Sequence, residues 1–427
     1  VLDDGKLAKA RPGRVLRGPG YDRSRRPAAV STGTVVPELA PIDELASSFL
    51  DRHGAPSVSI AVTDGGRLVY ARAFGYADVA GRELARPQSL YRIASISKPI
   101  TSAAIFLLVQ EGKLKLGDKI FEILPGYKPP GEDAEIDPRL AEITVLHCLQ
   151  HSGGWDRDQS FDAMFRSVDF AKALELPPPA DQDAVIRNMM AQPLDFDPGT
   201  RQAYSNFGYC LLGRVIAKLG GTGDYAGYVR QHILDPAGAG GMAQGRSLPG
   251  GRLDGEVRYY SPFRGPSVFA ESFGRRVPYP YGGWNLEAMD SHGAWVASAI
   301  DLARFAVSFD GEGALLKAET REQLFARPNG KIALDENGKP KASCYAAGWR
   351  RAEAADGVTF SHGGALAGTS SYIVKRPDGR NWVVLFNTRR SARRSYLPSA
   401  LLPELNRLLD EVRDWPTHDL FRAPGGE

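Results

Sequence analysis

The sequence predicts an α+β fold in which an antiparallel sheet, built from both ends of the chain, is flanked by helices and carries a mostly helical inserted domain. Three observations lead to this prediction. Two alternating, β-branched segments near the N-terminus, residues 57–62 and 67–76, are joined by the turn sequence Thr-Asp-Gly-Gly. Short alternating segments separated by turn signals return near the C-terminus. The chain between these two groups has mostly helical or irregular patterns.

We divide the chain into three parts on these patterns. Residues 1–40 form a basic N-terminal arm with Pro and Gly, which we expect to be flexible or draped over the body. Residues 41–125 and 295–420 form the sheet domain. Residues 126–294 form the helical insert, which we expect to make the other wall of an active-site cleft.

The N-terminal part of the sheet domain is predicted to hold a helix, a hairpin and a second helix. Residues 41–53 are amphipathic, which indicates a surface helix. The hairpin over residues 57–76 follows from its alternation and its glycine turn. The run from Ile100 to Val109 has almost no polar face, so it predicts a core helix, and Gly112 is a natural end for it.

The insert and the C-terminal part follow from the same criteria. Residues 236–285 are rich in Gly, Pro, Tyr and Phe and predict a long irregular stretch, of a kind that is often functional. Helices are predicted over residues 143–151, 162–174, 181–192, 207–219, 294–309 and 399–412. Strands are predicted over residues 345–352, 358–361, 370–375 and 382–387.

Bulk composition narrows the function. The chain has 427 residues, of which 43% are hydrophobic and 24% charged, as in ordinary globular proteins. Its formal net charge is +3, but residues 1–27 alone hold eight basic and three acidic residues, so the remainder is slightly acidic. A nucleic-acid-binding body is therefore excluded on electrostatic grounds. No segment approaches the roughly 18 apolar residues of a membrane span.

No cofactor or metal is expected. The three cysteines lie far apart and form no C-x-x-C pair. His147 and His151 have the i,i+4 spacing of a metal pair, but no third ligand is evident. The sequence lacks G-x-S-x-G, H-E-x-x-H and P-loop motifs. No signal peptide is recognisable, and since the first residue is Val1 this does not decide the compartment. The oligomeric state is equally undetermined.

Ser95-Ile96-Ser97-Lys98 is the strongest chemical signal, because it stands just before the predicted core helix. Residues three apart share a helix face, so the amine of Lys98 is expected beside the oxygen of Ser95. The helix N-terminus adds backbone N–H groups and a partial positive charge. The pattern predicts a serine acylated through lysine-assisted proton transfer. By itself, the pattern also fits a capped helix whose lysine extends its ammonium group to the surface.

Two further motifs follow in the chain. Residues 204–206 (Tyr-Ser-Asn) precede the predicted helix at 207–219, and a lysine ammonium close to that tyrosine would favour the phenolate. Residues 361–365 (Ser-His-Gly-Gly-Ala) lie between two predicted strands. Paired glycines at a strand edge suggest close approach of a ligand or another backbone, and a free N–H there could bind an oxyanion. Each motif alone also fits an ordinary helix start or turn.

In this order the three motifs resemble those of the serine β-lactamase and penicillin-binding-protein superfamily, whose related members carry S-x-x-K, S-D-N and K-T-G. The likeness is greatest to the class C-like branch, which includes family VIII carboxylesterases and D-amino-acid-specific peptidases and has Y-x-N as its second motif. The segments at 91–94, 143–154, 197–199 and 297–305 are also similar. The resemblance covers roughly residues 41–410.

The resemblance implies a role for each site residue. Ser95 would attack an ester or amide carbonyl, while Lys98 and Tyr204 share the proton and pass it to the leaving group. The N–H groups of Ser95 and Ala365 would bind the oxyanion. Asn206 would orient Lys98 or the acyl amide of the substrate. Water activated by Tyr204 would then release the acyl group.

The third motif departs from the family pattern. β-Lactamases and penicillin-binding proteins generally have Lys-Thr-Gly there, and the Lys and Thr hold the substrate carboxylate. This chain has His362-Gly363-Gly364, which weakens the case for β-lactams as main substrates and is similar to the esterase and peptidase relatives. His362 is expected to donate a hydrogen bond or to be partly charged, since its unperturbed pKa is near 6.5.

Aromatic residues are candidates for the specificity pocket. Trp155, Tyr281, Trp284 and Trp349 would give an aromatic-lined cleft that favours a bulky apolar acyl or alcohol group. Each of them also fits a place in the core.

The predicted function is a serine hydrolase that forms an acyl-enzyme on Ser95 and acts on a small ester or amide. A carboxylesterase on small esters is the leading expectation, with weak β-lactamase activity open. The alternatives are a D-amino-acid-specific or small-peptide amidohydrolase and, in another class, a penicillin-binding sensor or a pseudoenzyme that acylates without turnover. The resemblance favours a periplasmic or secreted location over a cytoplasmic one.

Overall fold

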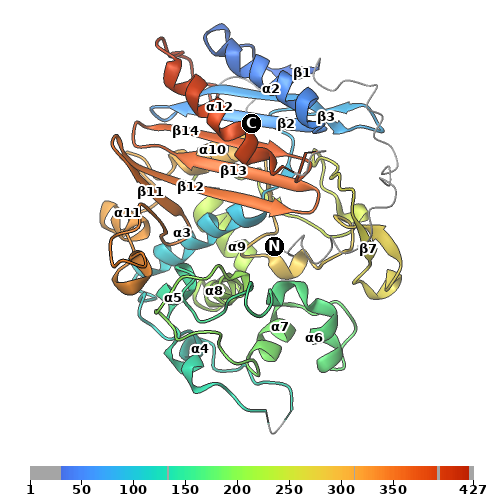
Figure 1. Ribbon diagram of the computed structural model, residues 1–427, viewed down its shortest axis with the longest axis vertical. Coiled ribbons are helices and arrows are strands. Elements are labelled where there is room, and N and C mark those ends of the chain that lie inside the picture. Colours follow the sequence, from blue (N-terminus) through green and yellow to red (C-terminus); the bar gives the residue numbers. More distant parts are fainter. Residues whose placement is uncertain (1–29, 132–133, 312, 392–394, 423–427) are drawn as a thin grey trace.

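The structure is a computed structural model that describes residues 30–131, 134–311, 313–391 and 395–422. Its centre is an antiparallel sheet in the order β1-β3-β2-β14-β13-β12-β11-β10, with β4 paired to β3 (Figure 1). Strands from the two chain ends meet where Ile60 of β2 lies opposite Val384 of β14. The predicted fold class is confirmed.

The N-terminal strands form around a tight hairpin. Gly65 and Gly66 join β2 to β3 with φ angles of 55° and 84°, the left-handed conformation that a two-residue type I′ turn requires. The strands are β1 (Ser31–Gly33), β2 (Ser57–Asp64), β3 (Arg67–Asp78) and β4 (Glu83–Leu84).

The C-terminal strands differ from their predicted limits in two places. The predicted strand at 345–352 is two strands, separated by a bend in which Gly348 has a φ of 82° and lies against Ser102. The predicted strand at 358–361 continues to Leu366. The strands are β10 (Ser343–Tyr345), β11 (Arg350–Ala354), β12 (Gly357–Leu366), β13 (Thr369–Lys375) and β14 (Arg380–Phe386).

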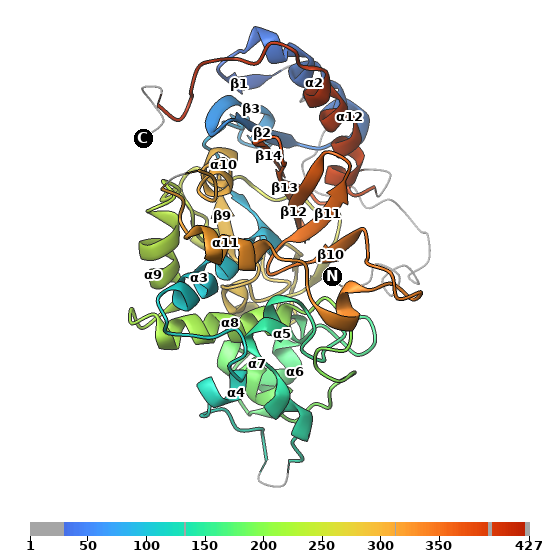
Figure 2. The same ribbon diagram turned by 90° about the vertical axis from the view of Figure 1, so that its left-hand side faces the viewer.

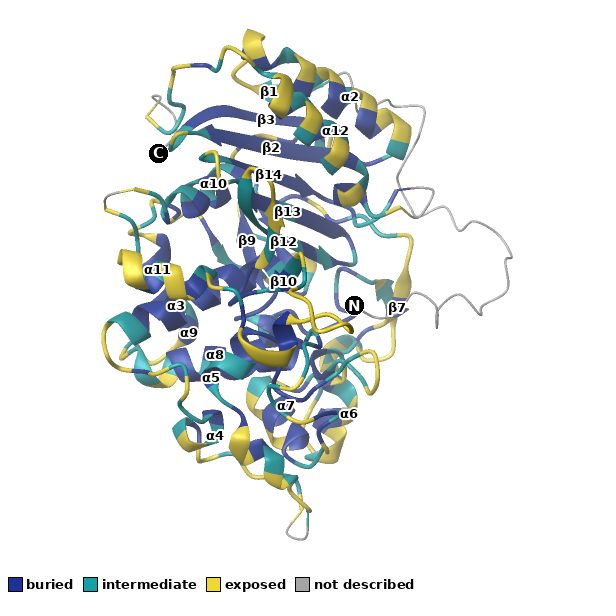
Figure 3. Ribbon diagram, turned by 60° about the vertical axis from the view of Figure 1, so that its left-hand side comes forward, coloured by how far each residue is buried: buried dark blue, intermediate teal, exposed yellow. Residues whose placement is uncertain are grey.

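Helices cover both faces of the sheet. Helices α2 (Ala40–His53) and α12 (Leu397–Glu411) lie together on one face, and α10 (Ala299–Val307) packs on the other against β14 and β2 (Figure 2). Alternation divides the strands between two cores. Along β2, Val58, Ile60 and Val62 pack toward α2 and α12, and Ala61 faces the larger core on the opposite side. Figure 3 shows the buried central strands beneath helices that expose their outer faces.

The insert lies on the side of the molecule away from α2 and α12 (Figure 2). Its residues 236–285 contain only short elements, as predicted, among them β6 (Ala243–Gln244), β7 (Arg264–Pro266) and β8 (Arg276–Pro278). The predicted helix at 162–174 is interrupted at Arg166. The α-helices are α4 (Ile120–Ile123), α5 (Val145–Leu149), α6 (Ser167–Ala173), α7 (Gln182–Met189), α8 (Asn206–Leu219) and α9 (Tyr225–Val229).

The predicted helix at 294–309 is wrong over its first residues. Residues 295–297 form strand β9, which pairs with β5 (Tyr91–Arg92) immediately before the Ser95 motif. The helix begins only after Ser298, whose side chain accepts a hydrogen bond from the Asp301 N–H at 3.0 Å and closes a capping box. β9 thus ties the insert to the segment that enters the site.

Part of the predicted N-terminal arm belongs to the sheet. Residues 31–33 form β1 and pair with β3, whereas residues 1–29 lie outside the described part of the chain. Within the described residues, no helix has the length and apolar character that crossing a membrane would need.

Candidate active site

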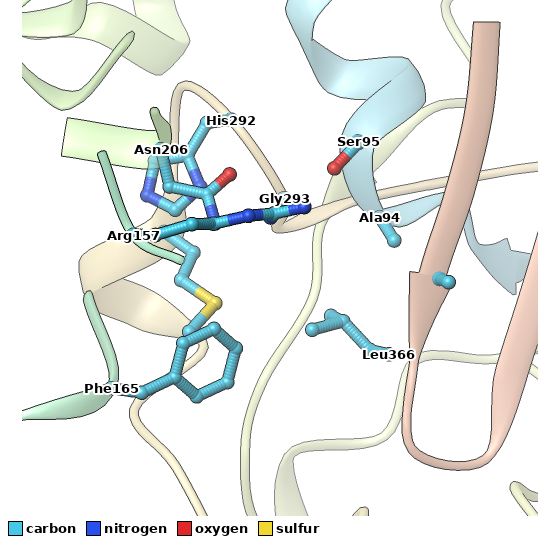
Figure 4. A pocket seen from close by; sticks show the side chains of 10 residues that line it. Ala94, Ser95, Arg157, Phe165, Asn206, His292, Gly293 and Leu366 are labelled. Atoms are coloured by element: carbon cyan, nitrogen blue, oxygen red, sulfur yellow. The ribbon is translucent and has the colours of Figure 1, made fainter. Parts of the chain in front are cut away.

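Ser95 lies in a single 3-10 turn, Ala94–Ile96, that leads directly into α3 (Ser97–Gln110). Ala94 has a φ of 48°, a left-handed conformation that a non-glycine residue rarely adopts and that is often found at functional sites. Ser95 is half-buried and opens onto a small cavity, the Ser95 pocket (Figure 4). The pocket is lined by Ala94, Ser95, Arg157, Phe165, Asn206, Met289, His292, Gly293, Ala365 and Leu366.

Two strands hold the Ser95 turn from behind. The hydroxyl of Thr369 donates to the carbonyl of Arg92 at 2.7 Å, and that of Ser371 donates to the carbonyl of Ile93 at 2.8 Å. Gly364 packs so closely that a Cβ on it would lie 2.0 Å from the oxygen of Ile93. This position therefore requires glycine, because any side chain would separate β12 from the turn.

Lys98 is fully buried beside Ser95, one turn further along the chain. Its Nζ lies 3.1 Å from Oγ of Ser95, 2.8 Å from Oδ1 of Asn206 and 3.2 Å from the carbonyl oxygen of His292. Two of these three neighbours can only accept hydrogen bonds. A neutral amine has two N–H donors and one lone pair, so it satisfies both acceptors and directs its lone pair at the serine hydroxyl.

The surroundings of Lys98 favour that neutral form. Burial lowers its pKa well below the ordinary 10.5, and the positive charge of Arg157 lowers it further, while the carboxylate of Asp162 acts in the opposite direction. After accepting a proton from Ser95, the ammonium would find an acceptor for each of its three hydrogens. The geometry is that of a general base.

Tyr204 packs against both partners. The nitrogen of Lys98 lies over its ring, 4.7 Å from the centroid. Burial raises the pKa of the Tyr204 phenol above 10, although a hydrogen bond with Ser95 and the charge of Arg157 both act to lower it. The phenol is therefore protonated at neutral pH. Of the two resting forms that would provide a base, the structure favours a neutral Lys98 over an ionised Tyr204.

Asn206 connects Lys98 to a carboxylate that the motifs did not indicate. Its Oδ1 accepts from Lys98, and its Nδ2 donates to Oδ2 of Asp162 at 2.6 Å. Asp162 also caps the 3-10 turn Ala163–Phe165 by accepting from the N–H of Met164. The sequence placed it only as the first residue of the predicted helix over 162–174, and no local pattern indicates a partner 44 residues away.

His362 is buried and neutral. Its Nδ1 lies 2.9 Å from the carbonyl oxygen of Gly363, which can only accept, so Nδ1 carries the proton and Nε2 accepts from the hydroxyl of Tyr345 at 2.8 Å. Burial, the largest cause, lowers the pKa of His362 to about 3. The expectation that His362 is partly charged is thus contradicted by its surroundings.

The glycine motif is part of a strand and not a turn. β11 pairs with β12 over Gly357–Ser361, and residues 362–366 continue along β13 past the last described pair with β11. Ala365 lies on this continuation and lines the Ser95 pocket. The N–H groups of Ser95 and Ala365 remain the candidates for an oxyanion hole, with Gly363 and Gly364 as the backbone that brings them together.

The aromatic candidates lie in the core. Trp155 and Trp284 are 5% and 3% exposed, packed on Phe207 and Tyr279 respectively, and neither lines the Ser95 pocket. Trp349 is completely buried among phenylalanines. Tyr281 packs near Arg92. The apolar wall is formed instead by Phe165, Met289 and Leu366.

The two histidines with metal-like spacing have structural partners. His147 completes the N-terminal capping box of α5 with Thr144. Nδ1 of His151 accepts from the N–H of Ser205 at 3.2 Å, which helps to place the neighbouring Tyr204. Within the described residues, no group of three or more His, Cys, Asp or Glu side chains is arranged to hold a metal ion.

Comparison with known proteins gives a consistent result. The model of the family described as Beta-lactamase matches residues 42–402. A penicillin-binding protein of Bacillus subtilis is 26% identical over 78% of this chain and 68% of its own length. A probable fimbrial assembly protein of Dichelobacter nodosus is 31% identical over 175 residues, which make up 41% of each chain. The chain thus spans well under half of that relative.

Solved structures share the fold at low sequence identity. The D-amino acid amidase of Ochrobactrum anthropi, in complex with L-phenylalanine, matches with a TM-score of 0.66 and 20% identity over 87% of this chain and 98% of its own. An octameric penicillin-binding protein homologue from Pyrococcus abyssi matches with a TM-score of 0.63 and 22% identity, over 86% of this chain and 77% of its own.

Proposed function

The chain belongs to the β-lactamase family of serine hydrolases, as its motifs suggested, and from this premise we propose that it hydrolyses small esters through an acyl-enzyme on Ser95. One observation carries the proposal. Nζ of Lys98 lies 3.1 Å from Oγ of Ser95, in surroundings that lower its pKa and occupy its two N–H donors. The nucleophile and its base are therefore in place before substrate arrives.

In the first step Ser95 attacks the carbonyl carbon while its proton moves to Lys98. The negative charge on the carbonyl oxygen is held by the N–H groups of Ser95 and Ala365, each worth about 3–4 kcal/mol in comparable sites. Tyr204 is protonated and hydrogen-bonded to Ser95, so it can give its proton to the departing alkoxide and recover one from Lys98. An alcohol leaves and the acyl group remains on Ser95.

In the second step water attacks the ester bond of the acyl-enzyme. Lys98, neutral again, accepts the proton of the water by way of Tyr204, whose hydroxyl takes up that proton as it passes its own to Lys98, and the proton then goes to Oγ of Ser95 as the acid leaves. The same groups serve both steps because the second is the chemical reverse of the first with water in place of the alcohol.

An ester is favoured over a β-lactam by the third motif. His362 is neutral and bonded to Tyr345 and Gly363, so that position offers no permanent charge to a β-lactam carboxylate. An amide of a D-amino acid is the second candidate. The similarity in fold to a D-amino acid amidase along 87% of this chain makes it the first alternative to test.

A substrate panel tests the proposal. Purified protein is assayed with 4-nitrophenyl acetate, D-alanine 4-nitroanilide and nitrocefin, each beside the Ser95→Ala variant. We expect the ester to have the highest kcat/KM and to lose at least about 1,000-fold in the variant. A preference for the anilide would assign an amidase instead. Acylation without turnover of any of the three would assign a sensor or a pseudoenzyme.

A further inference from the structure

Arg157 stands opposite the strand side of the Ser95 pocket. It follows Trp155 in the insert, lines the same cavity as Ser95, and extends across it toward the serine, whereas Leu366 lies on the other side (Figure 4). The motifs did not indicate this residue. Its place on the pocket wall puts a guanidinium within reach of a bound molecule.

The charge of this wall is concentrated in Arg157. Among the described residues that line the pocket, it alone carries a permanent charge. Burial lowers the pKa of the adjoining basic groups Lys98, His292 and His362, which disfavours their charged forms. The guanidinium of Arg157 is therefore the main cation that a molecule in the pocket meets, in a partly desolvated place where charge interactions are stronger than in water.

The contacts of the Arg157 guanidinium within the protein satisfy only part of its hydrogen-bonding capacity. Its carbon lies 4.5 Å from the centroid of the Tyr204 ring, and its Nε is buried with no hydrogen-bond partner. The acidic neighbour Asp158 is 4.0 Å from that nitrogen, but 85% exposed to solvent. The other carboxylate close to the pocket, Asp162, accepts from Asn206 and from the N–H of Met164. The contact with the ring of Tyr204 restrains the guanidinium, and the side chain extends across the cavity (Figure 4).

We propose that Arg157 binds a carboxylate of the substrate, so that the preferred substrates are small esters or amides carrying a free carboxylate in addition to the reacting carbonyl. A planar guanidinium held at a fixed orientation matches a carboxylate with two parallel hydrogen bonds. The pocket is small and is walled on its apolar side by Phe165, Met289 and Leu366, which favours a molecule with a short chain. This inference rests on the proposed function of Ser95.

The carboxylate can belong to the acyl group or to the leaving group, and two pairs of probes distinguish them. For the acyl group, the mono-4-nitrophenyl ester of glutaric acid is compared with its methyl-capped analogue. For the leaving group, 4-acetoxybenzoate is compared with its methyl ester. Within each pair only the charge changes, so the ratio of the two kcat/KM values measures recognition of the carboxylate.

The variants are Arg157→Gln, Arg157→Lys and the control Arg166→Gln. Arg166 directly follows the pocket residue Phe165, but it is half-exposed and paired with Asp169 at 2.7 Å. In the wild type we expect the charged member of one pair to be preferred. Arg157→Gln should lower that preference about 10- to 100-fold, mainly through KM, as for loss of a hydrogen bond between charged groups. The preference of Arg157→Lys for the charged probe should lie between those of the wild type and Arg157→Gln, and the preference of Arg166→Gln should match that of the wild type.

The outcomes separate the two claims. If the methyl-capped esters are hydrolysed in a Ser95-dependent manner but the charge preference is the same in wild type and Arg157→Gln, the carboxylate site is overturned and the hydrolase stands. If Arg157→Gln lowers kcat/KM equally for the charged and the methyl-capped probes, the carboxylate site is also overturned, because Arg157 would then affect the reaction and not recognition of the charge. If no probe is hydrolysed through Ser95, the proposed function itself fails. Should Arg157→Gln not fold, Arg157→Lys decides by the same ratio.

Discussion

Lys98 has three oxygen neighbours, and its protonation state determines whether Ser95 can be activated. Below the pKa of Lys98 the ammonium cannot accept a proton, so kcat/KM should rise with pH and level off above that pKa. Since burial lowers the pKa, the plateau should begin well below pH 10.5. A pH profile of ester hydrolysis checks this.

Lys98→Arg is the control for the pH profile. A guanidinium is never deprotonated in proteins, so this variant should lose at least about 1,000-fold across the whole pH range. A wild-type profile that rises only around the ordinary lysine pKa, or a Lys98→Arg variant with normal turnover, would contradict a neutral Lys98 base.

Substitution of Asp162 gives a second test, of how the charges around Lys98 set its pKa. The negative charge of Asp162 raises the pKa of Lys98, whereas the charge of Arg157 lowers it. Asp162→Asn removes the charge and keeps one of the two oxygens, so the asparagine can accept either from Asn206 or from Met164, which donate to different oxygens of Asp162. The pKa of Lys98 should then fall further, and the acidic limb of the pH profile should move to lower pH. Movement to higher pH would show that Asp162 is not coupled to Lys98 in this way.

Some residues of the candidate site could be identified from the sequence and others could not. Ser95, Lys98 and Asn206 were identified because they belong to short motifs, and the structure brings them together. Asp162 and Arg157 were missed, because each reaches the site through packing of the insert and not through a pattern of neighbouring residues. A carboxylate at a helix start and an arginine in a loop are common for structural reasons, so neither marks a functional site in the sequence.

Among the secondary-structure elements, the glycine pair of β12 determines how closely this strand packs on the Ser95 turn. A Cβ on Gly364 would lie 2.0 Å from the backbone of Ile93, whereas a Cβ on Gly363 would meet the ring of Tyr372 at 3.2 Å. Gly364→Ala should therefore destabilise the protein by about 1–3 kcal/mol and lower activity strongly, because β12 must move off the Ser95 turn.

Gly363→Ala is the matched control, one residue away in the same strand. Its neighbour is a side chain that can shift by a few tenths of an ångström, so stability should change by less than about 1 kcal/mol. Thermal unfolding and ester hydrolysis of both variants provide the comparison. Equal behaviour of the two would refute the claim that close contact with Ile93 sets the position of the nucleophile.

The predicted elements were most accurate where the local pattern was strong. The hairpin of β2 and β3 and helices α2, α8 and α12 are present close to their predicted limits. The strand that contains the glycine motif was predicted to end at residue 361, and glycine is unfavourable in strands by local preference. Pairing of Gly363 with Tyr372 and of Ala365 with Ser370 overrides that preference, and such pairing depends on β13.

Across the whole molecule, Arg92 joins the sheet domain to the long irregular stretch of the insert. It is 2% exposed, donates to the carbonyls of Pro280 and Arg246 at 2.7 and 2.5 Å, and lies 3.7 Å from the carboxylate of Glu256. Two residues later the chain enters the Ser95 turn. The anchor thus connects the position of residues 246–280 with that of the nucleophile.

Arg92→Met should destabilise the fold by about 3–5 kcal/mol, because it leaves the carboxylate of Glu256 buried and unpaired. The double variant Arg92→Met with Glu256→Gln should recover part of this loss, since the unpaired charge is gone. Denaturant unfolding measures both. If the single variant is as stable as the wild type, the anchor does not hold the two parts together.

The overall architecture followed from pattern, but the shape of the pocket did not. Strands at both chain ends and helices between them predicted the sheet and the insert, and the short motifs indicated the family. The pocket wall is made by Phe165, Met289 and Leu366, three apolar residues from distant segments. Their meeting depends on how the insert packs on the sheet, which no single segment encodes. The tryptophans chosen for that wall are in the core because large aromatic side chains also bury the most area.

The central claim is that Ser95 carries the acyl group, and intact-mass spectrometry with peptide mapping tests it most directly. After treatment with a fluorophosphonate, the account predicts one adduct per chain, located on the peptide containing Ser95 and absent from Ser95→Ala. An adduct on another residue, or ester turnover by a Ser95→Ala variant at the wild-type rate, would contradict it.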